Sequence, residues 1–151
     1  MRKLLIILSF PIFSFSQTYD ELMSITNLDN FKKVMIENQY QFDKVDSDGS
    51  VLYGYGLVKD EKNESKSRKW GYFNTDGSWG LQFFETPINL LENYGDYDDI
   101  TESITEKCVY NNITERNDID YVTYECDENI DGIFGFVVND DSGLIFYFPK
   151  K

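Results

Sequence analysis

Residues 70–85 read W-G-Y-F-N-T-D-G-S-W-G-L-Q-F-F-E and predict a β-hairpin. Asp76-Gly77 is a suitable two-residue turn, because glycine tolerates the positive φ that hairpin turns require. Side chains alternate along a strand, so this turn would collect the large residues on one face of the sheet. We expect that face to be buried and to set the register. The residues predicted to share it are Trp70, Tyr72, Trp79, Leu81 and Phe83.

Residues 134–148 read F-G-F-V-V-N-D-D-S-G-L-I-F-Y-F and repeat this pattern. With one gap opposite Trp79, glycine, aspartate, serine and leucine positions coincide in the two stretches. A three-residue loop over residues 140–142 would pair Phe136 with Phe146 and again gather large residues on one face. The opposite face would then carry apolar residues as well, namely Phe73, Phe84, Val137, Ile145 and Tyr147.

The elements before each hairpin also repeat. Residues 28–35 place apolar side chains at helical spacing, and residues 97–104 repeat that spacing. Two predicted strands follow each helix, so each half reads as a helix followed by four strands. We interpret this as an internal duplication, with repeat one over about 26–85 and repeat two over about 95–149. The expected fold class is α+β, with two tandem helix-plus-antiparallel-hairpin repeats forming one helix-on-sheet domain.

The N-terminal residues 1–16 read M-R-K-L-L-I-I-L-S-F-P-I-F-S-F-S and predict a secretory signal peptide. A charged start precedes an apolar run, and small residues precede the expected cleavage near Ser16 and Gln17. The run is shorter than the roughly 20 apolar residues that a spanning helix needs. We therefore expect residues 17–151 to be released into the periplasm or outside the cell as a single α+β domain.

The composition excludes several classes of function. The chain carries 27 Asp and Glu against 14 Lys and Arg, a net charge of −13, which repels nucleic-acid backbones and suits a basic partner. It contains no histidine, so the commonest general base, Ser-His and Cys-His nucleophile pairs and the usual zinc sites are all excluded. With 27 acidic residues, no carboxylate pair stands out for acid–base catalysis. We expect the protein not to be an enzyme and to need no cofactor.

The chain has two cysteines, Cys108 and Cys126. An exported protein meets an oxidising compartment, so we expect them to form a disulfide. They flank a predicted hairpin centred on Asn117 and can lie opposite each other. The same register pairs Tyr110 with Tyr124, and Asn112 with Val122. A redox-active pair is disfavoured, because no C-x-x-C motif is present.

The stretch D-E-N-I-D-G over residues 127–132 matches the first half of a calcium-binding loop. Asp127, Asn129 and Asp131 would be the ligands. The twelfth position of such a loop is a glutamate, and here it is Val138. We therefore favour an acidic turn between strands over a metal site.

The tandem arrangement of helices and antiparallel strands resembles the β-lactamase-inhibitor-protein type of exported repeat module. The resemblance extends over the mature chain as an order of elements, and it implies a protein that binds another protein through an aromatic-rich sheet surface. The leading hypothesis is a small exported protein-binding module, with inhibition of the partner as a more specific form of it, and a homodimer is compatible with this hypothesis. A small-ligand or calcium-binding domain and an immunity-type protein that neutralises a toxin are the alternatives. The expected partner-binding residues are Phe73, Phe84, Ile145 and Tyr147.

Overall fold

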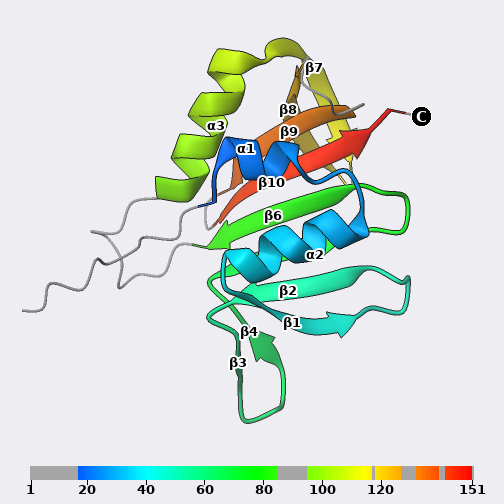
Figure 1. Ribbon diagram of the computed structural model, residues 1–151, viewed down its shortest axis with the longest axis vertical. Helices are drawn as coiled ribbons and strands as arrows, with labels where there is room; N and C mark the ends of the chain where they lie inside the picture. The colour runs from blue at the N-terminus through cyan, green and yellow to red at the C-terminus, as the bar shows by residue number, and fades with distance from the viewer. Residues whose placement is uncertain (1–16, 85–94, 117, 127–131, 140–141, 151) are drawn as a thin grey trace, which may run out of the picture.

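The fold is a mixed α+β arrangement dominated by one antiparallel sheet (Figure 1). The computed structural model describes residues 17–84, 95–116, 118–126, 132–139 and 142–150. Eight strands lie in the order β1-β2-β5-β6-β10-β9-β8-β7, and a separate two-stranded hairpin is formed by β3 and β4. The helices are α1 (Tyr19–Met23), α2 (Leu28–Glu37) and α3 (Gly95–Lys107). The strands are β1 (Tyr40–Val45), β2 (Val51–Tyr55), β3 (Val58–Lys59), β4 (Ser65–Lys66), β5 (Lys69–Phe73), β6 (Trp79–Phe84), β7 (Val109–Arg116), β8 (Ile119–Glu125), β9 (Gly132–Asn139) and β10 (Ser142–Pro149).

The sheet consists of two four-stranded meanders. The first meander is β1-β2-β5-β6 and the second is β7-β8-β9-β10. They join through their last strands, because β6 pairs antiparallel with β10 at the centre of the sheet. The first strands of the two meanders, β1 and β7, are therefore the two outer edges.

The short helices begin where the sequence supplies caps. Thr18 and Glu21 form a capping box that satisfies backbone N–H groups at the start of α1. The side chain of Asn27 accepts a hydrogen bond from the Asn30 N–H at the start of α2. Phe31 and Met35 then lie on the buried side of α2, as their spacing predicts.

All three helices lie on one face of the sheet, which we call the helix face (Figure 1). The main hydrophobic core lies between the helices and this face. Its centre is the β6–β10 seam, where Trp79 stacks on Tyr147 with ring centroids 5.5 Å apart and meets the edge of Phe134. Fully buried aromatic pairs of this kind contribute about 0.5–1.5 kcal/mol beyond the burial of their area.

The predicted two-residue turn of the first hairpin is wrong. Phe73 pairs with Trp79, and the Asn74 N–H donates to the Ser78 carbonyl at 2.8 Å, so three residues form the loop. Gly77 takes φ +83°, the left-handed conformation that ends a three-residue hairpin loop. The longer loop shifts one strand by one residue, which moves all of its side chains to the other face. Trp70 therefore lies opposite Gln82 rather than Phe83.

The predicted register of the second hairpin is wrong by one residue in the other direction. Phe136 pairs with Ile145, and Phe134 pairs with Tyr147, which leaves two residues between the strands instead of three. Phe134 and Phe136 thus share the helix face with Ile145, whereas Phe146 lies on the opposite, open face.

Candidate functional site

The four predicted partner-binding residues do not form an exposed patch. Ile145 is fully buried and Tyr147 is 7% exposed, because the corrected register turns both toward the helices. Phe73 packs against Phe31 of α2, with ring centroids 5.5 Å apart. Only Phe84, at the end of β6, keeps substantial exposure, at 39%.

The open face of the sheet carries a second, smaller hydrophobic cluster, formed by Tyr121, Leu144 and Phe146. The guanidinium of Arg116 lies over Phe146, 4.3 Å from the ring centroid, and pairs with Asp76 of the first meander at 3.5 Å. An arginine at this distance attracts the ring face and also shields it from water. The cluster is therefore closed by its own residues. The side chains packed around it are Tyr72, Ile119, Val137 and Phe148.

Burial raises the pKa of Tyr72 on this open face well above its ordinary value, with a smaller contribution from the neighbouring Tyr121. Arg116 opposes this shift, because a nearby cation favours the phenolate. The hydroxyl of Tyr72 therefore keeps its proton to a higher pH than an exposed tyrosine does. A neutral phenol beside packed rings is typical of a structural cluster.

Cys108 and Cys126 lie at disulfide-bonding distance, as predicted, at the base of the β7–β8 hairpin. The predicted pairing of Tyr110 with Tyr124 is confirmed. The predicted pairing of Asn112 with Val122 is wrong, because a bulge between Tyr110 and Ile113 places Val122 opposite Ile113.

The buried hydroxyl of Thr123 occupies the bulge. It donates to the main-chain and side-chain oxygens of Asn112 at 2.8 Å each, and it accepts from the Asn112 N–H at 3.3 Å. Bulges of this kind redirect side chains at the edge of a sheet. Here the bulge keeps Tyr110 and Ile113 on the same side of β7 although they are three residues apart.

Among the described residues, the exposed large apolar side chains of the second meander lie on this hairpin. Val109 is 69% exposed, Tyr110 56%, Ile113 62% and Val122 37%. Val109 lies on the open face, and the other three lie on the helix face. We call Tyr110, Ile113 and Val122 the β7 patch. Tyr124 and Phe136 continue it inward, with their rings stacked at 5.2 Å.

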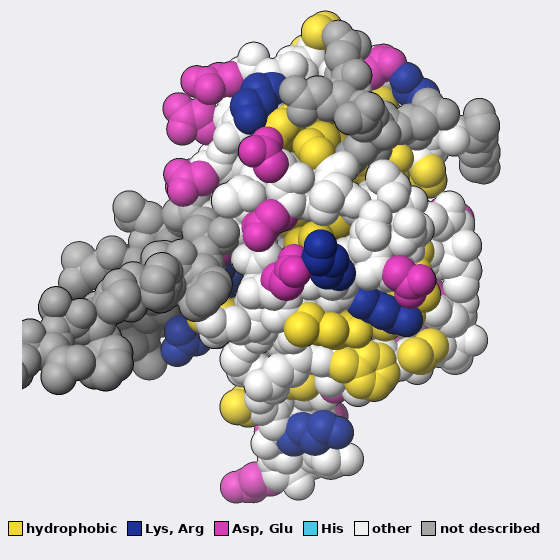
Figure 2. Space-filling view, in the orientation of Figure 1, with side chains coloured by type: hydrophobic (Ala, Val, Ile, Leu, Met, Phe, Trp, Pro, Cys, Tyr) yellow, Lys and Arg dark blue, Asp and Glu magenta, His cyan; other side chains and the backbone are white. Residues whose placement is uncertain are grey.

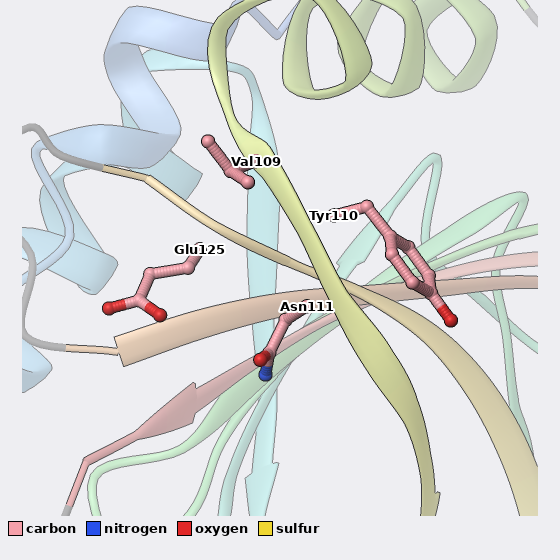
Figure 3. Close-up of a pocket in the computed structure, with 4 residues that line it drawn as sticks. All are labelled: Val109, Tyr110, Asn111 and Glu125. Carbon is pink, nitrogen blue, oxygen red and sulfur yellow. The ribbon is translucent and has the colours of Figure 1, made fainter.

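An open pocket of about 230 Å³ lies beside the β7 patch (Figure 3). It is lined by Val109, Tyr110, Asn111 and Glu125. The side chains of Val109, Asn111 and Glu125 lie on one side of the β7 ribbon, and that of Tyr110 projects to the other side. Glu125 forms an ion pair with Lys150 at the end of the described chain. The pocket thus offers apolar and amide groups from the start of β7 and a carboxylate from the end of β8.

The opposite edge of the sheet carries an analogous group. Ile36, Phe42 and Val45 are 63%, 54% and 57% exposed, and Figure 2 shows hydrophobic side chains gathered beside β1, below α2. This edge is partly covered, because Ser65 of the β3–β4 hairpin donates to the Asp43 carboxylate at 2.6 Å.

The predicted calcium ligands Asp127, Asn129 and Asp131 and the predicted signal peptide lie outside the described residues. Within the described ranges, no cluster of three or more acidic or cysteine side chains is placed to hold a metal ion. In the same part of the chain, no helix has the length and apolar character needed to cross a bilayer.

The β7 patch was not predicted as a candidate site from the sequence. In the sequence, Tyr110 was assigned only as the residue opposite Tyr124, and Ile113 was not assigned to a surface. The available signal was the repeat itself, which places apolar residues at the same points of both edge strands. The chain matches no protein-family model, no curated protein and no solved structure.

Proposed function

We propose that the mature chain is an exported, acidic protein-binding module that contacts its partner through the β7 patch. The observation that carries this proposal is the exposure of Tyr110 and Ile113, at 56% and 62%, on an edge strand next to the half-exposed Val122. Contiguous exposed apolar groups are typical of interaction surfaces. A tyrosine at the centre of such a surface is the kind of anchor that contributes most to binding.

The cysteine pair at the base of the hairpin supports this role. Cys108 immediately precedes β7, and its bond to Cys126 would hold the start of the strand in place. A surface that is already ordered loses little conformational entropy when a partner binds. A disulfide also suits the oxidising compartment that a cleaved signal peptide over residues 1–16 would lead to.

The proposed module is a duplication of one unit with a helix and four strands. The strand order supports this, because the two meanders are joined through equivalent strands. Tyr40 and Tyr55 lie opposite each other at the start of the β1–β2 hairpin, and Cys108 and Cys126 occupy the equivalent positions of the β7–β8 hairpin. In both hairpins a register shift occurs a few residues further along the first strand. The β7 patch is then the second copy of the apolar edge at β1, without a covering hairpin among the described residues.

The proposal is tested by site-specific photo-crosslinking in cells that export the protein. A photoreactive residue at position 113 should give a discrete covalent adduct, and one at position 61, in the exposed β3–β4 loop, should not. The adduct should disappear when Tyr110 is replaced by Ser in the same chain. Because Tyr110 is 56% exposed, Tyr110→Ser should change the free energy of unfolding by less than about 1 kcal/mol.

The proposal fails if position 113 gives no adduct, or if Tyr110→Ser leaves the adduct unchanged while circular dichroism shows a folded protein. The more specific hypothesis, inhibition, is tested with the captured partner after its identification by mass spectrometry. Its enzymatic or toxic activity should fall when the purified protein is added and should recover with the Tyr110→Ser variant.

A further inference from the structure

The two edges of the sheet differ in how open they are to main-chain pairing. Among the described residues, β7 pairs only with β8, and its eight residues contain neither lysine nor proline. Charged side chains, above all lysine, together with proline, β-bulges and covering loops are the means by which proteins protect an edge strand. Both edge strands contain a register shift, and β7 carries Glu115 and Arg116. The six-residue β1 is protected further, because it also carries Lys44 and receives the Ser65 contact at Asp43.

The helix-face side chains of the β7–β8 hairpin form a ladder of three cross-strand pairs. Tyr110 faces Tyr124, Ile113 faces Val122, and the third pair is Glu115 with Asp120. Two carboxylates directly opposite each other repel. Neither of them has an ion-pair partner among the described residues.

The second half of the chain, residues 95–150, is negatively charged overall, as Glu115 and Asp120 are. Residues 95–150 contain 14 Asp and Glu against 3 Lys and Arg, a net charge of −11, whereas residues 17–94 contain 13 against 8, a net charge of −5. The three cations of the second half, Lys107, Arg116 and Lys150, are already paired with carboxylates. A second copy of this chain would bring like charge to this edge, and a basic chain would bring opposite charge.

We propose that β7 accepts an extended basic segment of the partner protein as an additional strand. This rests on the proposed function and specifies its chemistry. Main-chain hydrogen bonds to the free edge of β7 supply affinity, and alternate side chains supply specificity. The bound segment places apolar side chains beside Tyr110 and Ile113, and a lysine or arginine beside Glu115, where it relieves the repulsion with Asp120.

The first test uses two short labelled peptides, one with alternating lysine and valine and one with alternating glutamate and valine. Fluorescence anisotropy should show that the lysine peptide binds at least about tenfold more tightly at low salt. This preference should shrink between about 0.01 M and about 0.15 M salt, because the screening length falls from about 30 Å to about 8 Å. Equal binding of the two peptides, or no binding of either, overturns the proposal.

A matched pair of charge reversals locates the binding site. Glu115→Lys should weaken binding of the lysine peptide by about tenfold, and Glu61→Lys, which changes the net charge equally in the β3–β4 loop, should leave it within about twofold. Both side chains are exposed, so both variants should fold, which thermal unfolding verifies. An equal loss in the two variants would indicate attraction by net charge alone and would refute the assigned site.

Strand addition itself is tested through the backbone. Amide hydrogen exchange should slow in β7 and remain unchanged in β1 when the lysine peptide is bound. Methylating alternate peptide nitrogens should abolish binding for the set that faces β7 and preserve it for the other set. If β7 amides are already protected in a dimer of the free protein, a second copy occupies the edge and the proposal is wrong. If position 113 crosslinks to a partner but neither peptide binds, the protein-binding function stands and strand addition is rejected.

Discussion

Reduction of the Cys108–Cys126 bond should destabilise the protein by an amount that the chain separation sets. The two cysteines are 18 residues apart. In the chain-entropy model, a crosslink that closes a loop of this length removes enough unfolded-state entropy to stabilise the native state by about 3 kcal/mol. With a urea dependence of about 2 kcal/mol per molar, the unfolding midpoint should fall by about 1.5 M. The melting temperature should fall by about 6–12 °C for a domain of this size.

The measurement compares urea unfolding of the oxidised protein, the reduced protein and the Cys108→Ser/Cys126→Ser double variant. The sequence contains no other cysteine, so a reductant has no second target. The double variant should unfold at the same midpoint with and without reductant, which controls for the reagent. Amide exchange should accelerate most in β7, because the bond joins the start of this edge strand to the end of β8. An unchanged midpoint on reduction, or two free thiols in the exported protein by mass spectrometry, would refute the reasoning.

Three further outcomes are expected. Ile145→Ala should lower the free energy of unfolding by about 2–5 kcal/mol in urea titrations, and Phe84→Ala, 39% exposed on the same sheet, by less than about 2 kcal/mol. A similarly small loss for both variants would support the register predicted from the sequence, which places both side chains on one exposed face. Removing the cation over Phe146 with Arg116→Ala should cost about 1–2 kcal/mol in the same assay, and no loss would mean that this contact does not stabilise the open face. Burial raises the pKa of Tyr40 above its ordinary value of 10.0, so the folded protein keeps this proton at pH values where the unfolded chain loses it. The free energy of unfolding should therefore fall as the pH rises above about 10. Ultraviolet titration should show that this phenol ionises only as the protein unfolds, and ionisation in the folded protein would contradict its burial.

The order of the elements was predictable because it depends on periodicity and composition. Helical spacing at Phe31 and Met35 and the glycine-containing turn at Gly77 are local signals, and each lies in the element that it predicts. The cysteine pairing was predictable because the two cysteines flank one hairpin, and the register near its base is the predicted one; the bulge shifts the register only beyond Tyr110.

The register was not predictable, because it depends on one residue in each loop. At Asp76-Gly77, a two-residue turn and a three-residue loop have the same sequence signature, and tertiary packing selected the second. Gly71 shows why. It lies on the helix face against Met35, Leu81 and Phe31, where a larger residue such as Tyr72 would displace α2. The predicted binding patch failed with the register, because a shift of one residue exchanges the two faces of a strand.

The pairing of β6 with β10 determines how a truncated or incompletely folded chain would aggregate. The stretch L-I-F-Y-F over residues 144–148 is rich in β-formers, uncharged and without proline, which is the composition of an aggregation-prone segment. In the native sheet it has β9 on one side, β6 on the other, and side chains buried on both faces. A chain truncated before residue 142 would lose this strand and leave β6 without its neighbour, although the first meander could still form. Truncation and slow completion of the second half should therefore produce insoluble protein rather than a working half-module.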